Sequence, residues 1–174
     1  MAKVLVIRLS AIGDVAMTVP VIYSAAKANP EDSFTVLTQA FLMPLFMNRP
    51  PNVEVIGINT KGAEKGLIGL LKFDFDVILD LHNVIRTIII CTFFRLNGKR
   101  VFVLDKARKE RKRLTAIKGK RLYPLRPVIV RYADVFRAAG LNYTETFTSL
   151  YEESPAELSG MASVAGIKKG KWIG

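Results

Sequence analysis

Short apolar runs recur along this chain with helical stretches between them, and this alternation most constrains its fold. Several of the runs are continuously apolar, which is typical of strands that helices cover on both faces. Strands that alternate with helices indicate parallel βαβ units. The predicted strands span 3–9, 33–38, 53–58, 77–81 and 100–104, and the predicted helices span 15–29, 41–48, 64–71, 84–96 and 128–139. The sequence therefore predicts an α/β fold with a Rossmann-like, doubly wound parallel sheet.

The length and the C-terminal residues predict how the chain is divided into domains. The chain has 174 residues, half of them hydrophobic, which suffices for one domain with a substantial core. We assign residues 1–166 to that domain, with a short helix at 155–165. The final residues, Gly-Ile-Lys-Lys-Gly-Lys-Trp-Ile-Gly, read as a linker and the first half of a strand. We therefore predict that 167–174 begin a truncated second domain; the alternative is a strand that pairs with the same sheet.

Cysteine usage and apolar run lengths predict the compartment. The single cysteine, Cys91, cannot form an internal disulfide, which fits a reduced, cytoplasmic setting. The N-terminus has too few consecutive apolar residues for a signal peptide. The longest apolar run, 87–94, is far shorter than the roughly 20 residues that span a bilayer. We predict a soluble protein.

The positive charge is concentrated in one segment. Of the formal net charge of +11, most comes from Lys106 to Arg121, which contains nine basic residues and one acid, Glu110. A local basic patch indicates an anionic partner: nucleic acid, anionic lipid or a phosphorylated substrate. The alternative is a solvated loop. Nucleic acid is disfavoured because the segment holds no aromatic side chain on which bases could stack.

The residues that follow the predicted strands are the candidates for a site, because open α/β sheets bind ligands beyond the carboxyl ends of their strands. They are Ser10, Gly13 and Asp14 after the first strand, Asn59, Thr60 and Lys61 after the third, and His82, Asn83 and Arg86 after the fourth. His82 is the only histidine, which excludes a site with several histidine ligands. It is either a ligand contact or a structural histidine. Arg86 can bind a carboxylate or phosphate, or pair with Asp80.

Asp14 has two interpretations. A carboxylate at a helix start stabilises the helix electrostatically, and Gly13 permits the tight turn before it. A carboxylate at a strand end is equally well placed for general-base catalysis. The loop lacks both a dinucleotide-binding glycine pattern and a P-loop, which disfavours a nicotinamide enzyme. Pro20 leaves two arrangements open: a helix from Asp14 that is kinked at Pro20, or a helix capped by Thr18 after an extended loop at 13–17.

Two motifs resemble the ADP-heptose:lipopolysaccharide heptosyltransferases, glycosyltransferase family 9. In that family a strand is followed by Arg-x-Ser/Thr-x-x-Gly-Asp and an apolar turn ending in Pro. The matching residues here are Arg8, Ser10, Gly13, Asp14 and Pro20. The stretch from Asp76 to Thr87, DVILDLHNVIRT, resembles the family's second motif, and KKGKWIG resembles the approach to its second domain. The likeness extends over residues 3–140 and the last few residues.

The resemblance implies a GT-B architecture, in which two Rossmann-like domains enclose the reaction. This chain then corresponds to the N-terminal, acceptor-side half, and the absent half would bind ADP-heptose as donor substrate, without a metal or other cofactor. Asp14 corresponds to the base that deprotonates the acceptor hydroxyl while heptose is transferred, with inversion, to a lipopolysaccharide inner-core acceptor. We expect a full-length protein to be a glycosyltransferase and this chain alone to be inactive.

The implied acceptor is rich in carboxylate and phosphate, and basic and polar residues at the strand ends would bind it. The candidates are Ser10, Gly13, Lys61, Lys65, His82, Arg86, Arg108, Arg111 and Arg113. The basic run at 106–121 would also suit peripheral contact with the anionic inner membrane. Two alternatives stay open: another GT-B sugar transferase with a different donor, and a non-catalytic domain that binds anions or nucleic acid. A half without its partner domain exposes its cleft face, which favours oligomerisation there.

Overall fold

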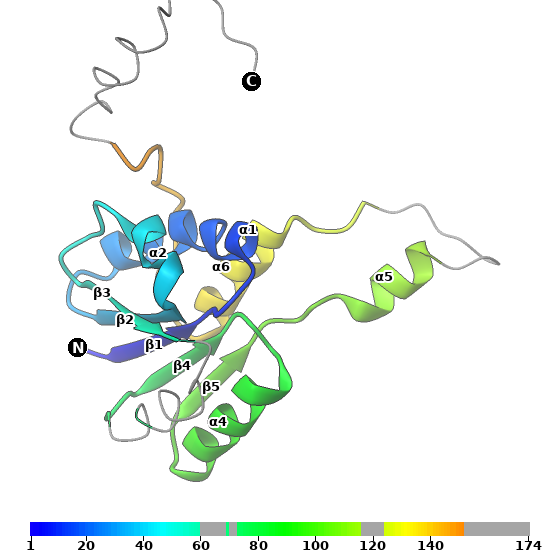
Figure 1. The fold of residues 1–174 in the computed structure, drawn as a ribbon, viewed down its shortest axis with the longest axis horizontal. Helices are drawn as coiled ribbons and strands as arrows, with labels where there is room; N and C mark the ends of the chain where they lie inside the picture. The colour runs from blue at the N-terminus through cyan, green and yellow to red at the C-terminus, as the bar shows by residue number, and fades with distance from the viewer. Residues whose placement is uncertain (60–68, 70–72, 116–123, 152–174) are drawn as a thin grey trace, which may run out of the picture.

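The computed structural model describes residues 1–59, 69, 73–115 and 124–151, and within them it shows one five-stranded parallel sheet (Figure 1). The strands are β1 (Lys3–Ile7), β2 (Ser33–Gln39), β3 (Val53–Ile58), β4 (Val77–Asp80) and β5 (Arg100–Val103). Their order is β3-β2-β1-β4-β5, and all four neighbouring pairs are parallel. The predicted α/β fold is confirmed, and each predicted strand is present with small differences at its ends.

Helices cover both faces of the sheet. They are α1 (Ile12–Ala16), α2 (Val19–Ala28), the 3-10 helix η1 (Ala40–Phe46), α4 (Ile85–Leu96), α5 (Arg108–Leu114) and α6 (Val128–Ala138). In Figure 1, α2 and α6 lie on one side of the strands and α4 lies on the other, while α5 projects from the body of the molecule. Within the described part of the chain, no helix is both long enough and apolar enough to cross a membrane.

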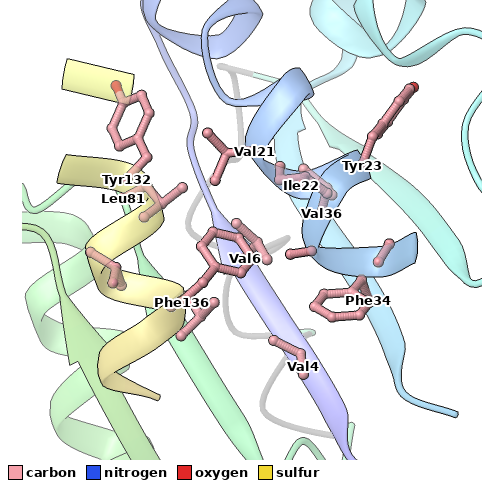
Figure 2. Packing of buried hydrophobic residues seen from close by; sticks show 14 of the residues in the cluster. Val4, Val6, Val21, Ile22, Tyr23, Phe34, Val36, Leu81, Tyr132 and Phe136 are labelled. Atoms are coloured by element: carbon pink, nitrogen blue, oxygen red, sulfur yellow. The ribbon is translucent and has the colours of Figure 1, made fainter. Parts of the chain in front are cut away.

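The central strand β1 explains why the runs are continuously apolar. Val4 and Val6 belong to the core that β1 forms with α2 and α6, where Phe34 and Phe136 are also buried (Figure 2). Leu5 and Ile7, which alternate with them, belong to the second core, under α4. All four β1 side chains are completely buried. Because successive side chains point to opposite faces, a strand covered on both faces needs apolar residues at every position.

The predicted helix 15–29 is two helices. Thr18 is the N-cap residue of α2 and Pro20 lies in its first turn, where a missing N–H leaves no hydrogen bond unmade. The alternative of one helix kinked at Pro20 is therefore wrong. The expectation of an extended loop at 13–17 is also wrong, because α1 covers Ile12–Ala16 and the Thr18 hydroxyl closes the break by donating to Val15 O at 2.7 Å.

Two other elements differ from the prediction. The segment predicted as a helix at 41–48 is the 3-10 helix η1, which contains Pro44 and packs so closely on β3 that a Cβ at Gly57 would lie 2.7 Å from the Cα of Ala40. The basic segment, for which a solvated loop was the alternative, contains the exposed helix α5. The predicted helices at 64–71 and 155–165 lie outside the described residues, Gly69 excepted, as does the predicted domain boundary at 166/167.

Candidate functional site

A cleft lies at the carboxyl ends of β1 and β4. The chain proceeds from β1 outward to β2 and β3 and then returns to β4 on the other side of β1, so the strand order reverses at the β1–β4 pair. Open α/β sheets bind ligands at such a switch point. The cleft has a volume of about 490 Å³. It is lined by Leu9, Ser10, Gln39, His82, Asn83, Val84, Ile85, Arg86 and Arg108.

The cleft brings together four of the predicted acceptor-binding residues: Ser10, His82, Arg86 and Arg108. The other candidates lie elsewhere. Gly13 and Asp14 are in α1, beside the cleft but outside its lining. Arg111 and Arg113 follow Arg108 on α5, and Arg113 lines a separate cavity of about 480 Å³ between β5, α5 and α6. Lys61 and Lys65 lie outside the described residues.

Arg8 and Asp14 form an ion pair just beyond the end of β1. Arg8 is buried, with 6% of the residue exposed. One of its amino groups donates to the Asp14 carboxylate and the other donates to Leu81 O at 2.5 Å. The Arg8 guanidinium carbon also lies 5.8 Å from the centre of the Tyr132 ring, in a cation–π contact. Arg8, at the end of β1, therefore contacts α1 through Asp14, the end of β4 through Leu81 and α6 through Tyr132.

Asp14 is held in place and still reaches solvent. Its side chain is 41% exposed. It is not the cap residue of α1, which is Ala11, but it lies in the first turn, where a carboxylate stabilises the positive end of a helix. Asp14 therefore interacts with the helix through its charge, as a carboxylate at a helix start is expected to, and its hydrogen-bonded partner is Arg8.

The turn after β4 is organised by Asp80, the last residue of that strand and completely buried. Its carboxylate accepts hydrogen bonds from the backbone N–H groups of His82 at 2.9 Å and Asn83 at 2.8 Å. The Cys91 thiol also donates to it, over 3.7 Å. Burial, with the Asp80 charge second, raises the pKa of Cys91 to about 12, so this thiol stays protonated. Arg86, for which pairing with Asp80 was one expectation, lines the cleft.

Asn83 fixes the path of that turn into the cleft. It adopts a left-handed backbone conformation, with φ of 48°, which asparagine tolerates better than most residues. Its side-chain amide donates to Leu104 O at 2.7 Å, which joins the turn to the end of β5. The backbone beside His82 is therefore anchored on two neighbouring strands.

Burial and nearby cations lower the pKa of two basic groups in this region, His82 and Lys106. Burial lowers the pKa of His82, and the Arg8 charge lowers it further, against smaller opposing effects of Asp80 and Asp14. Burial likewise lowers the pKa of Lys106, followed by the charges of Arg108 and Arg8. His82 is thus a neutral imidazole at neutral pH, able to accept one hydrogen bond and donate another.

Buried polar atoms without partners gather at this edge of the sheet. Among the residues that the structure describes, they include Arg8 Nε, Thr38 Oγ1, His82 Nδ1 and Tyr132 Oη. Arg8, Thr38 and His82 lie at or just beyond the carboxyl ends of three adjacent strands, and Tyr132 packs against Arg8. Buried polar groups in proteins are nearly always paired with protein, water or ligand. This edge therefore has unused capacity to bind a polar ligand or water.

The lowered pKa of His82 predicts a pH dependence of stability. In the unfolded chain His82 takes up a proton near the ordinary histidine pKa of 6.5, whereas in the folded chain it takes up that proton only at a lower pH. The free energy of unfolding should therefore fall as the pH drops through and below that value. Urea unfolding between about pH 7.5 and pH 5 measures this slope. We expect His82→Asn to reduce it; an unchanged slope would contradict the assignment.

Sequence reasoning missed several residues of the site. Gln39 and Ile85 line the cleft from the end of β2 and the start of α4, and the strand-end rule could have included Gln39. Tyr132 lies more than 120 positions after Arg8 in the sequence, and no local pattern indicated that α6 would bring it beside that residue. Among the described residues there is no group of three or more His, Cys, Asp or Glu side chains that could hold a metal ion.

Comparisons with known proteins bear on the fold. No family model and no curated protein matches the chain. The structure of the Escherichia coli heptosyltransferase WaaC with ADP matches with a TM-score of 0.56 and 21% identity, covering 84% of this chain and 49% of that one. A glycosyl transferase family 9 structure from Veillonella parvula matches with a TM-score of 0.62 and 21% identity, covering 96% of this chain and 51% of that one. The chain thus spans about half the length of these glycosyltransferases and shares their fold.

Proposed function

We propose that this chain is the acceptor-side half of an inverting glycosyltransferase that transfers heptose from ADP-heptose to an anionic lipopolysaccharide inner-core acceptor. The observation that supports this most is the cleft at the β1–β4 switch point, which combines two arginines, Arg86 and Arg108, with an adjacent carboxylate, Asp14. The fold shared with two glycosyltransferases supports the reaction class. The choice of ADP-heptose as donor and of lipopolysaccharide inner core as acceptor comes from the sequence motifs that resemble those of heptosyltransferases.

In this proposal the two arginines bind the acceptor. Arg86 follows the turn after β4 and Arg108 begins α5, so the cleft presents cations from two directions. Guanidinium groups bind carboxylate and phosphate through paired, charge-assisted hydrogen bonds. His82, neutral at neutral pH, adds a hydrogen-bonding group for a sugar hydroxyl without adding charge. The acceptor's anionic groups are thereby held in the cleft by Arg86 and Arg108.

Asp14 then acts as the general base. It takes the proton of the acceptor hydroxyl as that oxygen forms a bond to the anomeric carbon of the donor sugar. The bond from that carbon to the ADP oxygen breaks, and ADP leaves with the electron pair. Attack from the face opposite the leaving group inverts the configuration. Arg8 orients the carboxylate through their ion pair, and its attachment to Leu81 O holds this geometry fixed relative to β4.

Acceptor binding tests the proposal on the chain itself. We expect calorimetric titration with a lipopolysaccharide inner-core oligosaccharide to show binding at the cleft. Arg86→Gln combined with Arg108→Gln should weaken that binding by about ten-fold or more, since a hydrogen bond to a charged group contributes about 1.5–3 kcal/mol. Arg137→Gln is the matched control, because Arg137 is exposed on α6 and pairs with Asp134.

Two results would overturn the proposal. Equal acceptor affinity in the cleft variant and the control would show that Arg86 and Arg108 do not bind the acceptor. Turnover of ADP-heptose by this chain alone would show that no second domain is needed to bind the donor.

A further inference from the structure

Helix α4 has apolar side chains on both of its faces. Thr87, Ile90, Cys91 and Phe94 are buried against the sheet. On the opposite side Ile85, Ile88, Ile89, Phe93 and Leu96 are exposed. At 3.6 residues per turn these five form one stripe along the whole helix. A helix that is apolar all round is expected in a protein interior or a membrane environment, yet this face of α4 is open to solvent.

The polar residues of α4 leave the stripe uninterrupted. Thr92 lies within it, but its hydroxyl donates to Ile88 O at 2.8 Å, so the helix backbone satisfies that group. The only charged residues of α4 are Arg86 and Arg95, and both are exposed. Helical spacing places them at opposite edges of the stripe. The outer face of α4 is therefore an apolar strip with a cation on each side and no acid.

Further positive charge lies at one end of this strip. Arg86 of α4 and Arg108 of α5 line the same cleft, so the two helices begin near each other. In α5, Arg108, Lys109, Arg111, Lys112 and Arg113 are exposed and Glu110 is the single acid. Figure 1 shows α4 on the side of the sheet away from α2 and α6, and α5 projecting from the body, so neither helix is shielded by that layer.

We infer that the outer face of α4 docks on an anionic phospholipid bilayer, with α5 supplying electrostatic attraction to the headgroups. Apolar residues bordered by arginine and lysine are the pattern of interfacial helices, which lie in the membrane plane. At 12 residues α4 is too short to span a bilayer, which agrees with that orientation. A second copy of the chain would bring two basic rims together, so charge favours the lipid over self-association.

The strip is continuous with the cleft, since Ile85 and Arg86 belong to both. A bilayer against α4 would therefore present membrane-embedded molecules at the cleft mouth. That consequence rests on the proposed function, in which the acceptor is part of a lipid. The docking itself does not, because it depends on α4 and α5 alone and can be measured without any sugar.

Vesicle co-sedimentation of the chain tests the inference. We expect binding to vesicles of phosphatidylcholine with phosphatidylglycerol, weaker binding to phosphatidylcholine alone, and loss of binding as salt rises. Ile89→Glu should weaken binding by about ten-fold or more, because it puts a charge into the apolar contact. Leu96→Glu, at the other end of the strip, is a second variant with the same expectation. Lys109→Gln with Lys112→Gln should weaken binding about five-fold per neutralised charge.

Phe41→Glu is the matched control. Phe41 is 67% exposed and Ile89 is 66% exposed, but Phe41 lies on η1 rather than α4. The control should bind vesicles like the unchanged chain. Equal binding by the Ile89 and Phe41 variants would overturn the inference and leave a purely electrostatic contact. If light scattering shows that Ile89→Glu dissociates a dimer while vesicle binding is unchanged, the inference is overturned, and the outer face of α4 is instead a contact with a second copy of the chain.

Discussion

Asp14→Asn should reduce sugar transfer by about 10²–10⁴-fold in a protein that joins this chain to a donor-binding domain, because an amide cannot accept the acceptor's proton. Asparagine has nearly the same shape, so acceptor binding to the Arg86 and Arg108 side of the cleft should stay within about two-fold. The readout is kcat in single-turnover and steady-state assays. The loss should appear in kcat and kcat/KM together, since the interaction belongs to the transition state.

Stability separates this effect from unfolding. Arg8 is buried while Asp14 is 41% exposed, so loss of the carboxylate charge should lower the free energy of unfolding by about 1–3 kcal/mol, and kcat is compared at temperatures where urea unfolding shows the variant to be folded. Asp74→Asn is the matched control, since Asp74 is also an aspartate paired with a basic side chain, Lys99, but is highly exposed and outside the cleft. Its kcat should equal that of the unchanged protein. Undiminished turnover by the Asp14 variant would remove the base assignment.

Arg8 connects that chemistry to the fold. A base is effective when its carboxylate is held at a fixed position beside the reacting hydroxyl. Here the position is set by a buried guanidinium whose second bond goes to the backbone just after β4. The strand end, the helix that follows it and the neighbouring strand are thereby connected by one side chain, so Arg8 is a positioning residue in the proposed mechanism.

The sheet could be predicted from the sequence because its strands are recorded in local patterns. Runs such as Val4–Ile7 have apolar residues on both faces, and only a strand that is covered on both sides needs that. The positions of Ser10, His82 and Arg86 in one cleft also follow from a general rule, that parallel strands end at one edge of the sheet.

The rest of the site depends on contacts between distant residues. The sequence left two arrangements open at Pro20, because a proline fits either a kink or the first turn of a helix. The structure has Thr18 as the N-cap residue of α2, and its hydroxyl donates to Val15 O at the end of α1, a contact that no local pattern distinguishes. Tyr132 reaches Arg8 only because α6 packs on α2, which no local pattern records. The helical state of α5 was also missed, because its basic residues gave no apolar periodicity to identify it.

Phe136→Ala should lower the free energy of unfolding by about 3–5 kcal/mol, the usual cost of removing a buried phenylalanine ring. Phe136 of α6 is completely buried, and its side chain lies beside Val6 of β1 in the core shown in Figure 2. Its ring is part of the contact that holds α6 on the sheet, one helical turn from Tyr132. The measurement is urea unfolding followed by circular dichroism.

Phe41→Ala is the control that distinguishes the effect of a buried cavity on stability from the effect of losing an aromatic ring at any position. Phe41 is largely exposed, so the same substitution there should change stability by no more than about 0.5 kcal/mol. A Phe136 variant as stable as this control would mean that α6 is not packed on β1.

Because α6 holds Tyr132 against Arg8, the Phe136 cavity should also loosen the Arg8–Asp14 pair. In the joined protein we therefore expect a lower kcat at temperatures where the variant is still folded, whereas Phe41→Ala leaves kcat unchanged.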